Sequence, residues 1–294
     1  MNKFTITQFR AAYPDDDACL DKIFQIRFNN LVCPKCESDK KFTRVKERRS
    51  YQCPNCGFQV YPTKDTIFEK TTTPLTYWFY AIYLQTTTRN GVAAKELERQ
   101  LNICYKTALR MAHQIKKLMA DKDSTAVFGM VEIDEAYLGA QSKYFQNDKR
   151  KKYDEIYLKN PMQGKTIILG ILERNGKVFT QIIPAPTKEI VEKIIKAKVI
   201  AYSKISTDEA GIYTHLSRDY DHNTVNHGSR EWVRGSCHVN NIESFWNQVK
   251  RTIKGTHIHV SDKHIQKYLD EVAFRWEHRN QQGTMFETIL SRVA

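Results

Sequence analysis

Hydrophobic and polar positions repeat with two different periods along this chain. From residue 74 to about residue 120 the apolar residues recur at helical spacing, in LTYWFYAIYLQTT, GVAAKELERQL and CYKTALRMAHQIKKLM. Beyond a polar joint at 121–124 the spacing changes to the alternation of strands, as in VEIDEAYLG. Because apolar residues recur about every 3.6 positions in a helix and every second position in a strand, this change predicts a domain boundary.

The helical part predicts three helices, broken at 89–91 and at 101–103. The last two, joined by a short turn, are similar to a helix-turn-helix, whose second helix enters the DNA major groove. We therefore expect Lys106 and Arg110 to contact DNA. Helix pairs of this kind also occur in proteins that never touch DNA. The aromatic residues at 77–83 fit core packing better than base stacking.

The later part of the chain predicts a mixed α/β domain. One strand is expected to end at Asp134, and a hairpin follows, because Asn175-Gly176 between two apolar runs is a strong turn signal. An amphipathic helix over KEIVEKIIKAKVI, a strand ending at Asp208 and a further helix over EAGIYTHL come next. This order, with a late helix in HVNNIESFWNQVKR, matches the ribonuclease H-like fold.

Three acidic residues are candidates for a catalytic metal site. Asp134 and Asp208 close apolar runs, and Glu243 shares the polar face of the late helix with Lys250. Converging carboxylates suit Mg²⁺ or Mn²⁺, which can assist phosphodiester chemistry. Each acid also has an ordinary explanation: a strand end, a helix cap for Asp208, or a solvated helix position for Glu243. Glu132 shares the strand face of Asp134 and competes with it as a ligand, whereas Glu135 points away.

Four of the seven cysteines form two C-x-x-C pairs, which indicates a zinc ribbon. The expected structural Zn²⁺ ligands are Cys33, Cys36, Cys53 and Cys56. The segment between the pairs, KKFTRVKERRSYQ, is strongly basic, and either contacts DNA phosphates or forms a solvated hairpin. Cysteines used in this way favour a reducing compartment over a disulfide framework.

The length and the net charge of the chain limit which kinds of protein it can be. The chain has 294 residues, enough for two or three compact units, and a net charge of +13 with a pI of about 9.3. Such a charge favours nucleic acid as the partner, although a generic basic surface also accounts for it. A basic segment at 143–165 is expected to form a loop, either solvated or tracking phosphates. No apolar run approaches the roughly 20 residues of a membrane span, and no signal peptide is evident, so we expect a cytoplasmic protein.

The chain resembles the DDE transposases of bacterial insertion sequences. The resemblance depends on VEIDEAYLG, STDEA, VNHGSREWVRG and HVNNIESFWNQVKRTIKGTH in that order, and covers nearly the whole chain. It is closest to the family with an N-terminal zinc ribbon and a ribonuclease H-like, ISXO2-like catalytic domain. The resemblance implies a catalytic triad of Asp134, Asp208 and Glu243, with Lys250 as the trailing basic residue.

The expected architecture is a multidomain α+β and α/β protein. It has a leading helix and zinc ribbon at 1–70, a helix-turn-helix-like region at 71–122 and a ribonuclease H-like, mixed-sheet catalytic domain at 123–294. The implied activity is metal-dependent cleavage and strand transfer on double-stranded DNA, at the element's terminal repeats and at target DNA, by a homo-oligomer. Arg234 and Arg251 are further expected DNA contacts. Two alternatives stay open: a catalytically inactive zinc-ribbon regulator, and a ribonuclease H-like nuclease.

Overall fold

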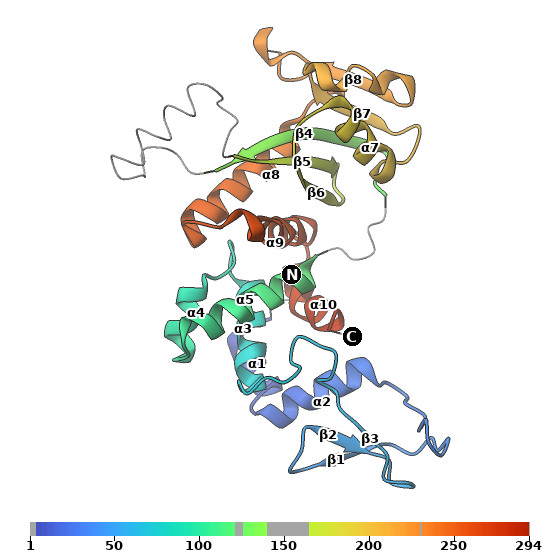
Figure 1. Ribbon diagram of the computed structural model, residues 1–294, viewed down its shortest axis with the longest axis vertical. Coiled ribbons are helices and arrows are strands. Elements are labelled where there is room, and N and C mark those ends of the chain that lie inside the picture. The colour runs from blue at the N-terminus through green and yellow to red at the C-terminus, as the bar shows by residue number, and fades with distance from the viewer. Residues whose placement is uncertain (1–3, 121–125, 140–164, 230, 294) are drawn as a thin grey trace. The chain divides into compact units, whose positions relative to one another are not determined.

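The computed structural model describes residues 4–120, 126–139, 165–229 and 231–293, and divides into two compact units (Figure 1). The first unit comprises residues 1–120 and 278–294, and the second comprises residues 121–277. We had expected residues 278–294 in the C-terminal domain, but they pack with the N-terminal helices. The joint at 121–124 and nearly all of the basic segment at 143–165 lie outside the described residues.

The first unit is built around the largely apolar helix α3. Trp78 and Phe79 of α3 are completely buried, so the aromatic run packs in the core, as expected. Phe286 of the C-terminal helix lies among Phe9, Tyr13 and Phe79. The helices of this unit are α1 (Ile6–Ala12), α2 (Asp16–Arg27), α3 (Leu75–Thr87), α4 (Ala94–Leu101), α5 (Tyr105–Met119) and α10 (Met285–Ser291).

A short left-handed turn joins α4 to α5. Asn102 ends α4 with a φ of 51°, a conformation that asparagine adopts more readily than most residues. Leu97 and Leu101 of α4 and Met111 of α5 are buried, so the two helices pack through their apolar faces. The predicted helices at 75–87, 94–101 and 105–119 are all present.

A three-stranded antiparallel sheet completes the first unit. Its order is β1-β2-β3, formed by β1 (Thr43–Val45), β2 (Ser50–Gln52) and β3 (Gln59–Val60). Phe24 of α2 stacks on Tyr51 of β2, with ring centroids 4.0 Å apart, and Asp15 caps α2 by accepting a hydrogen bond from the Ala18 amide. The ring contact attaches the small sheet to α2, and the cap fixes where α2 begins.

The second unit contains a five-stranded mixed sheet with the order β6-β5-β4-β7-β8. The central strand β4 pairs antiparallel with β5 and parallel with β7. The Asn175-Gly176 hairpin joins β5 to β6, as predicted, and Asn175 has a φ of 62°. The strands are β4 (Met130–Leu138), β5 (Thr166–Glu173), β6 (Val178–Ile183), β7 (Lys204–Asp208) and β8 (Asp221–Val225).

Helices cover the two faces of this sheet (Figure 1). The helix α7 (Lys188–Lys198) buries Val191 and Ile195 against one face, together with Ile133 of β4. The other face is covered by α8 (Asn240–Arg251) and α9 (Ile265–Glu277), which pack on Ala136 and Leu138. A π-helical turn at Thr252–His257 continues α8. No helix among the described residues is long and apolar enough to cross a bilayer.

Two details of this unit differ from the prediction. The segment after Asp208 forms short 3-10 turns at Gly211–Tyr213 and Leu216–Arg218, and not an α-helix. The strand β8 was not predicted, because its sequence DHNTV carries polar residues on both faces and only its last residue is fully buried. The strand β8 lies at the edge of the sheet and is held by its hydrogen bonds to β7. Such a strand can form without a regular alternation of apolar residues.

Candidate active site and metal centre

Asp134 lies within β4 and not at its end, as the sequence had suggested. The strand continues to Leu138 because its antiparallel pairing with β5 runs that far. Parallel pairing joins residues 130–132 of β4 to residues 204–206 of β7, and β7 ends at Asp208. Glu132 pairs with Ser206, so continuing the same register by two residues places Asp208 beside Asp134. Neighbouring strands in a sheet lie roughly 4.8 Å apart.

Asp208 closes β7 with a local turn. Its Oδ1 accepts a hydrogen bond from the Ala210 amide at 3.0 Å. The neighbouring Thr207 is completely buried, and its hydroxyl lies 2.9 Å from Nε2 of His222 on β8. The alternative explanation, that Asp208 caps an α-helix, fails because no α-helix follows it.

The first turn of α8 carries Glu243. The apolar face of α8 is buried through Ile242, Phe245, Trp246 and Val249, as the helical spacing predicted. Trp246 lies against Asp134 and favours its charged form, through a contact looser than a hydrogen bond. The helix therefore brings Glu243 toward the strand that carries Asp134.

The charges of Asp208 and Glu243 act on Asp134. Burial, then the carboxylate of Asp208 and then that of Glu243 raise the pKa of Asp134 to about 6. The carboxylates of Asp208 and Glu243 therefore lie near enough to Asp134 for their charges to act on it. A divalent cation would offset this negative charge, and carboxylate oxygens are ligands that Mg²⁺ prefers. The donor chemistry of these carboxylates suits such an ion, while among the described residues only the four cysteines form a group of three or more possible ligands within 4.8 Å of one another.

Glu135 faces the opposite side of the sheet, as expected from strand alternation. It lies by Tyr213, which belongs to the core on the α7 side. Burial and the charges of Asp134 and Asp208 together raise the pKa of Glu135 to about 7, against the opposing effect of Tyr213, which lowers it. The charge of Glu135 therefore adds to the negative potential near Asp134 and Asp208 from the opposite face of the sheet.

Glu132, the expected competitor of Asp134 as a ligand, has other partners. Its side chain is completely buried and accepts hydrogen bonds from the backbone amides of Asn241 (2.9 Å) and Ile242 (3.0 Å). The side chains of Asn241 and Arg174 donate to it as well. Glu132 therefore caps α8 from a neighbouring strand.

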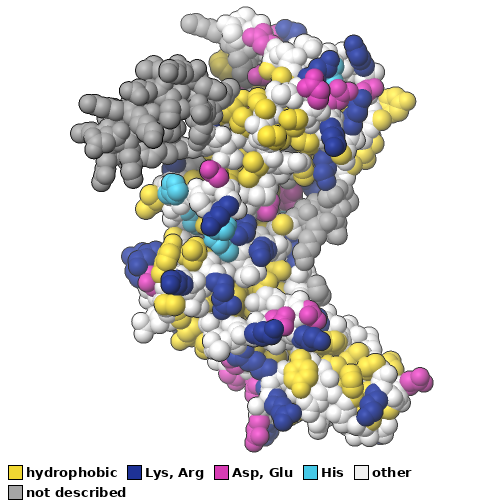
Figure 2. Space-filling view, in the orientation of Figure 1, with side chains coloured by type: hydrophobic (Ala, Val, Ile, Leu, Met, Phe, Trp, Pro, Cys, Tyr) yellow, Lys and Arg dark blue, Asp and Glu magenta, His cyan; other side chains and the backbone are white. Residues whose placement is uncertain are grey.

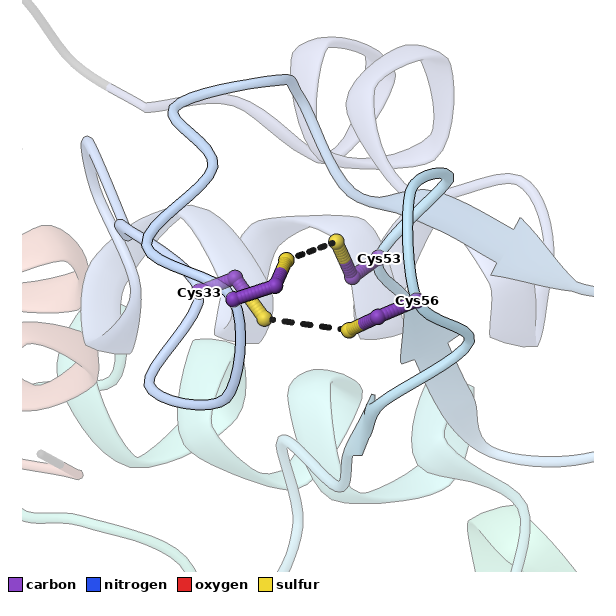
Figure 3. Close-up of side chains that lie close together, drawn as sticks. Cys33, Cys53 and Cys56 are labelled. Atoms are coloured by element: carbon purple, nitrogen blue, oxygen red, sulfur yellow. Dashed lines mark hydrogen bonds between the residues drawn. The ribbon is translucent and has the colours of Figure 1, made fainter.

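Four cysteines from the two knuckles converge in the first unit (Figure 3). The Sγ atoms of Cys33 and Cys56 are 3.5 Å apart, those of Cys36 and Cys53 are 3.7 Å apart, and all four lie within 4.8 Å of one another. A tetrahedral Zn²⁺ with Zn–S bonds of about 2.3 Å needs sulfur atoms about 3.8 Å apart. The cluster fits a structural zinc ion.

The two knuckles repeat the same backbone turn. The Glu37 amide donates to the Cys33 carbonyl, and the Gly57 amide donates to the Cys53 carbonyl. Glu37 and Gly57 both have left-handed φ values, 54° and 72°. This turn points the two sulfurs of each C-x-x-C pair to the same side.

Comparison with known proteins assigns the family. A family model for the ISXO2-like transposase domain matches residues 126–277, more than half of the chain. The chain belongs to this transposase family. A second model, for a transposase zinc-ribbon domain, matches residues 14–59 and includes all four cysteines. A Halobacterium salinarum protein described as an "uncharacterized protein in transposable element ISH50" is 26% identical over 281 residues, which cover 90% of this chain and 94% of that protein.

The transposase domain carries a basic pocket beside α8. Lys250 and Arg251 line an open pocket of about 610 Å³ together with Asn247, Lys254 and Gly255. Lys250 and Glu243 lie on the same polar side of the helix, as predicted from their spacing. The pocket is a cationic surface two helical turns from the acids.

The other expected DNA contacts lie elsewhere. Arg234 of the transposase domain is exposed and paired with Glu231 at 2.5 Å. Lys106 and Arg110 are exposed on α5 of the first unit, where the Arg110 guanidinium lies 5.5 Å from the centre of the Trp78 ring. Lys and Arg side chains are spread over both units on the face in Figure 2, with acidic side chains among them.

Sequence reasoning missed the partners that hold the acids in place. Arg174 follows β5 inside the hairpin turn, where nothing in the local pattern separates it from a solvated residue. Gly170 pairs with Asp134 across the sheet and leaves room for Trp246. The position of Glu132 on the strand face of Asp134 was the available signal, and it suggested a competing ligand and not a helix cap.

Proposed function

We propose that this protein is an insertion-sequence transposase that binds element-end DNA and catalyses metal-dependent phosphodiester cleavage and strand transfer. The observation that carries the proposal is the match of residues 126–277 to a transposase family, in a domain where the charges of Asp208 of β7 and Glu243 of α8 act on Asp134 of β4. Burial and the two nearby carboxylates make the charged form of Asp134 costly without a cation. Functional sites are where such cost is tolerated.

The sheet order supports a ribonuclease H-like fold for the transposase domain. A hairpin of antiparallel strands lies on one side of β4, and parallel strands lie on the other. The first acid is on the central strand, the second ends the adjacent parallel strand, and the third is on a helix that covers the sheet. We propose this fold because the order of strands and acids agrees with the one expected from the sequence.

In the proposed reaction, Asp134, Asp208 and Glu243 would hold Mg²⁺ or Mn²⁺, which supplies positive charge to the attacking and leaving oxygens. A water oxygen bonds to the scissile phosphorus while the bond from phosphorus to the 3′ oxygen breaks, leaving a free 3′-hydroxyl. The oxygen of that hydroxyl then bonds to a phosphorus of target DNA while the bond from this phosphorus to the target's 3′ oxygen breaks, and the released target strand takes the proton as a new 3′-hydroxyl. Lys250 on the same side of α8 as Glu243 binds a DNA phosphate and offsets its charge.

Two regions of the first unit are proposed to bind the element's terminal repeats. The pair α4 and α5 is proposed to act as a helix-turn-helix, with Lys106 and Arg110 toward DNA. The zinc ribbon, with Zn²⁺ on Cys33, Cys36, Cys53 and Cys56, is proposed to present its basic segment to phosphates. Arg234 and Arg251 would contact phosphates near the acids. Two element ends must be joined, so we propose a homo-oligomer on DNA, acting in the cytoplasm.

The test uses as substrate the DNA that flanks the gene, where the proposed function requires terminal inverted repeats. Purified protein is incubated with an end-labelled fragment carrying one flank, or two flanks together with a target plasmid, in Mg²⁺ or Mn²⁺. We expect a break at the repeat boundary and joined products with the plasmid. The variants Asp134→Asn and Glu243→Gln should bind the fragment with unchanged affinity and give neither product.

Each alternative has its own result. Cleavage without joining, even with paired ends, would favour a ribonuclease H-like nuclease. Specific binding with no cleavage under any metal condition would favour an inactive regulator. Cleavage that persists in Glu243→Gln would remove this residue from the site.

A further inference from the structure

Both carboxylate oxygens of Glu132 accept hydrogen bonds, and three of these bonds come from the first residues of α8. Glu132 lies on β4 two residues before Asp134 and on the same strand face. Its Oε2 accepts from the backbone amides of Asn241 and Ile242, at 2.9 and 3.0 Å. Its Oε1 accepts from Nδ2 of Asn241 at 2.8 Å and from Nε of Arg174 at 2.7 Å. With both oxygens occupied and no exposed surface, Glu132 is poorly placed to bind a cation.

The helix α8 depends on this remote cap. The first amides of a helix have no partner within it, and an oxygen of the preceding residue usually accepts from them. Here the residue at that position is Val239, which has no side-chain acceptor. A buried carboxylate also interacts favourably with the positive end of the helix dipole. Glu132 therefore fixes where α8 begins relative to β4.

Arg174 fastens the segment that leads into α8 to the same carboxylate. Its Nη1 donates to the Ser236 carbonyl at 2.8 Å, and its Nη2 donates to the His238 carbonyl at 3.0 Å. Its own backbone amide donates to the Met130 carbonyl on β4. The Arg174 side chain is mostly buried, so removing either charge leaves the other without its partner in a place that water hardly reaches.

We propose that Glu132, held by Arg174, is a positioning residue that sets the distance between Asp134 and Glu243. Asp134 and Glu132 lie on the same face of β4. The amide that Glu132 caps, that of Ile242, lies in the first turn of α8 together with Glu243. Any shift of the helix start moves Glu243 relative to Asp134. The inference rests on the proposed function, because it concerns the cation site formed by these acids.

The test substitutes Glu132→Gln, which keeps the shape of the side chain. The glutamine side chain has one acceptor oxygen, whereas glutamate has two. Its NH₂ group must therefore face N–H donors that accept no hydrogen bond, and these donors lose their partner. We expect hydrogen exchange of the Asn241 and Ile242 amides to rise more than 10-fold and Mn²⁺ affinity, measured by calorimetry, to fall about 10- to 100-fold, as for other residues that orient metal ligands. DNA affinity should stay within about twofold, so kcat falls more than KM rises.

The matched control is Glu271→Gln on α9. Glu271 is also completely buried and pairs with an arginine, Arg275, at 3.0 Å, but it does not touch the start of α8. We expect it to lower the thermal unfolding temperature and leave Mn²⁺ affinity unchanged. If Glu132→Gln does not fold, Arg174→Lys replaces it, because lysine keeps the charge and cannot reach both carbonyls and the carboxylate.

The outcomes separate this inference from the proposed function. Equal losses of Mn²⁺ affinity in the Glu132 and Glu271 variants would overturn the positioning role, as would unchanged amide exchange at the start of α8. A wild-type protein that binds Mn²⁺ but never cleaves flank DNA would count against the proposed function alone. The exchange measurement needs no metal, and so tests the cap in every case.

Discussion

Gly170 on β5 and Trp246 on α8 fit together so closely that no side chain can be added between them. A Cβ atom at Gly170 would lie 2.5 Å from Cζ2 of Trp246. Gly170 is the partner of Asp134 in the sheet, and Trp246 lies against Asp134. The absent side chain therefore lets the α8 helix pack directly over the strand position of the first acid.

The substitution Gly170→Ala should destabilise the transposase domain and reduce catalysis. Trp246 is 3% exposed and cannot move aside without shifting α8, so we expect a loss of about 1–3 kcal/mol, as for other overpacked cores. Urea unfolding gives the stability, and cleavage of flank DNA gives the activity. The control is Gly211→Ala, where a new Cβ meets no atom within 4 Å. Equal stability of the two variants would contradict the prediction.

The sequence predicted the elements whose apolar residues repeat regularly. The helix at 75–87, the hairpin at Asn175-Gly176 and the apolar face of α8 all have this property, and the structure contains each of them. It did not predict β8, whose polar residues are held by pairing with β7. Nor did it place Asp134 within β4, because the end of an apolar run does not show how far a strand is extended by its neighbour.

The candidate site was predicted less completely than the fold. The sequence could single out Asp134, Asp208 and Glu243 because the local pattern around each acid is enough to place it at the end of an apolar run or on a helix face. The bond from Ile242 to Glu132 joins residues 110 positions apart, and no local pattern indicates it. A helix cap is ordinarily sought next to the helix in the sequence, and here the structure places it on a distant strand.

The basic pocket beside α8 should contribute to DNA affinity through charge. Removing one phosphate contact, in Lys250→Ala or Lys254→Ala, should lower the slope of log affinity against log salt by about 1. Lys193→Ala removes the same charge from an exposed position on α7, over the other face of the sheet, and should leave the slope unchanged. Fluorescence anisotropy at several salt concentrations measures the slopes. Identical slopes for all three variants would assign DNA binding to another surface.

The zinc site should stabilise the ribbon alone. We expect Cys36→Ser to lose bound zinc and the order of β1, β2 and β3, because a small sheet of this size depends on its metal. DNA affinity should fall, while thermal unfolding of the transposase domain should not change. Native mass spectrometry and hydrogen exchange report the two effects. The exposed Cys104 lies outside the cluster, so Cys104→Ser is the control. Full zinc occupancy in Cys36→Ser would contradict the assignment.

The stability of the metal-free protein should depend on pH through Asp134. Its folded-state pKa of about 6 is above the ordinary value near 3.9, so the folded chain keeps a proton that the unfolded chain releases. The stabilising contribution is therefore complete below about pH 4 and is lost as the pH rises through about 6. We expect the unfolding temperature to fall across this range in the absence of metal, and to fall less in Asp134→Asn.

Added Mn²⁺ should reverse this trend, since the cation competes with the proton for the same carboxylate. Mn²⁺ affinity should rise with pH until Asp134 is deprotonated, and then level off. Glu135 has a folded-state pKa of about 7 and acts in the same direction, so Glu135→Gln separates its share from that of Asp134. Thermal unfolding and calorimetry from pH 4.5 to 8 measure both effects. A Mn²⁺ affinity that does not change between pH 5 and 7 would show that the acids do not bind the cation together.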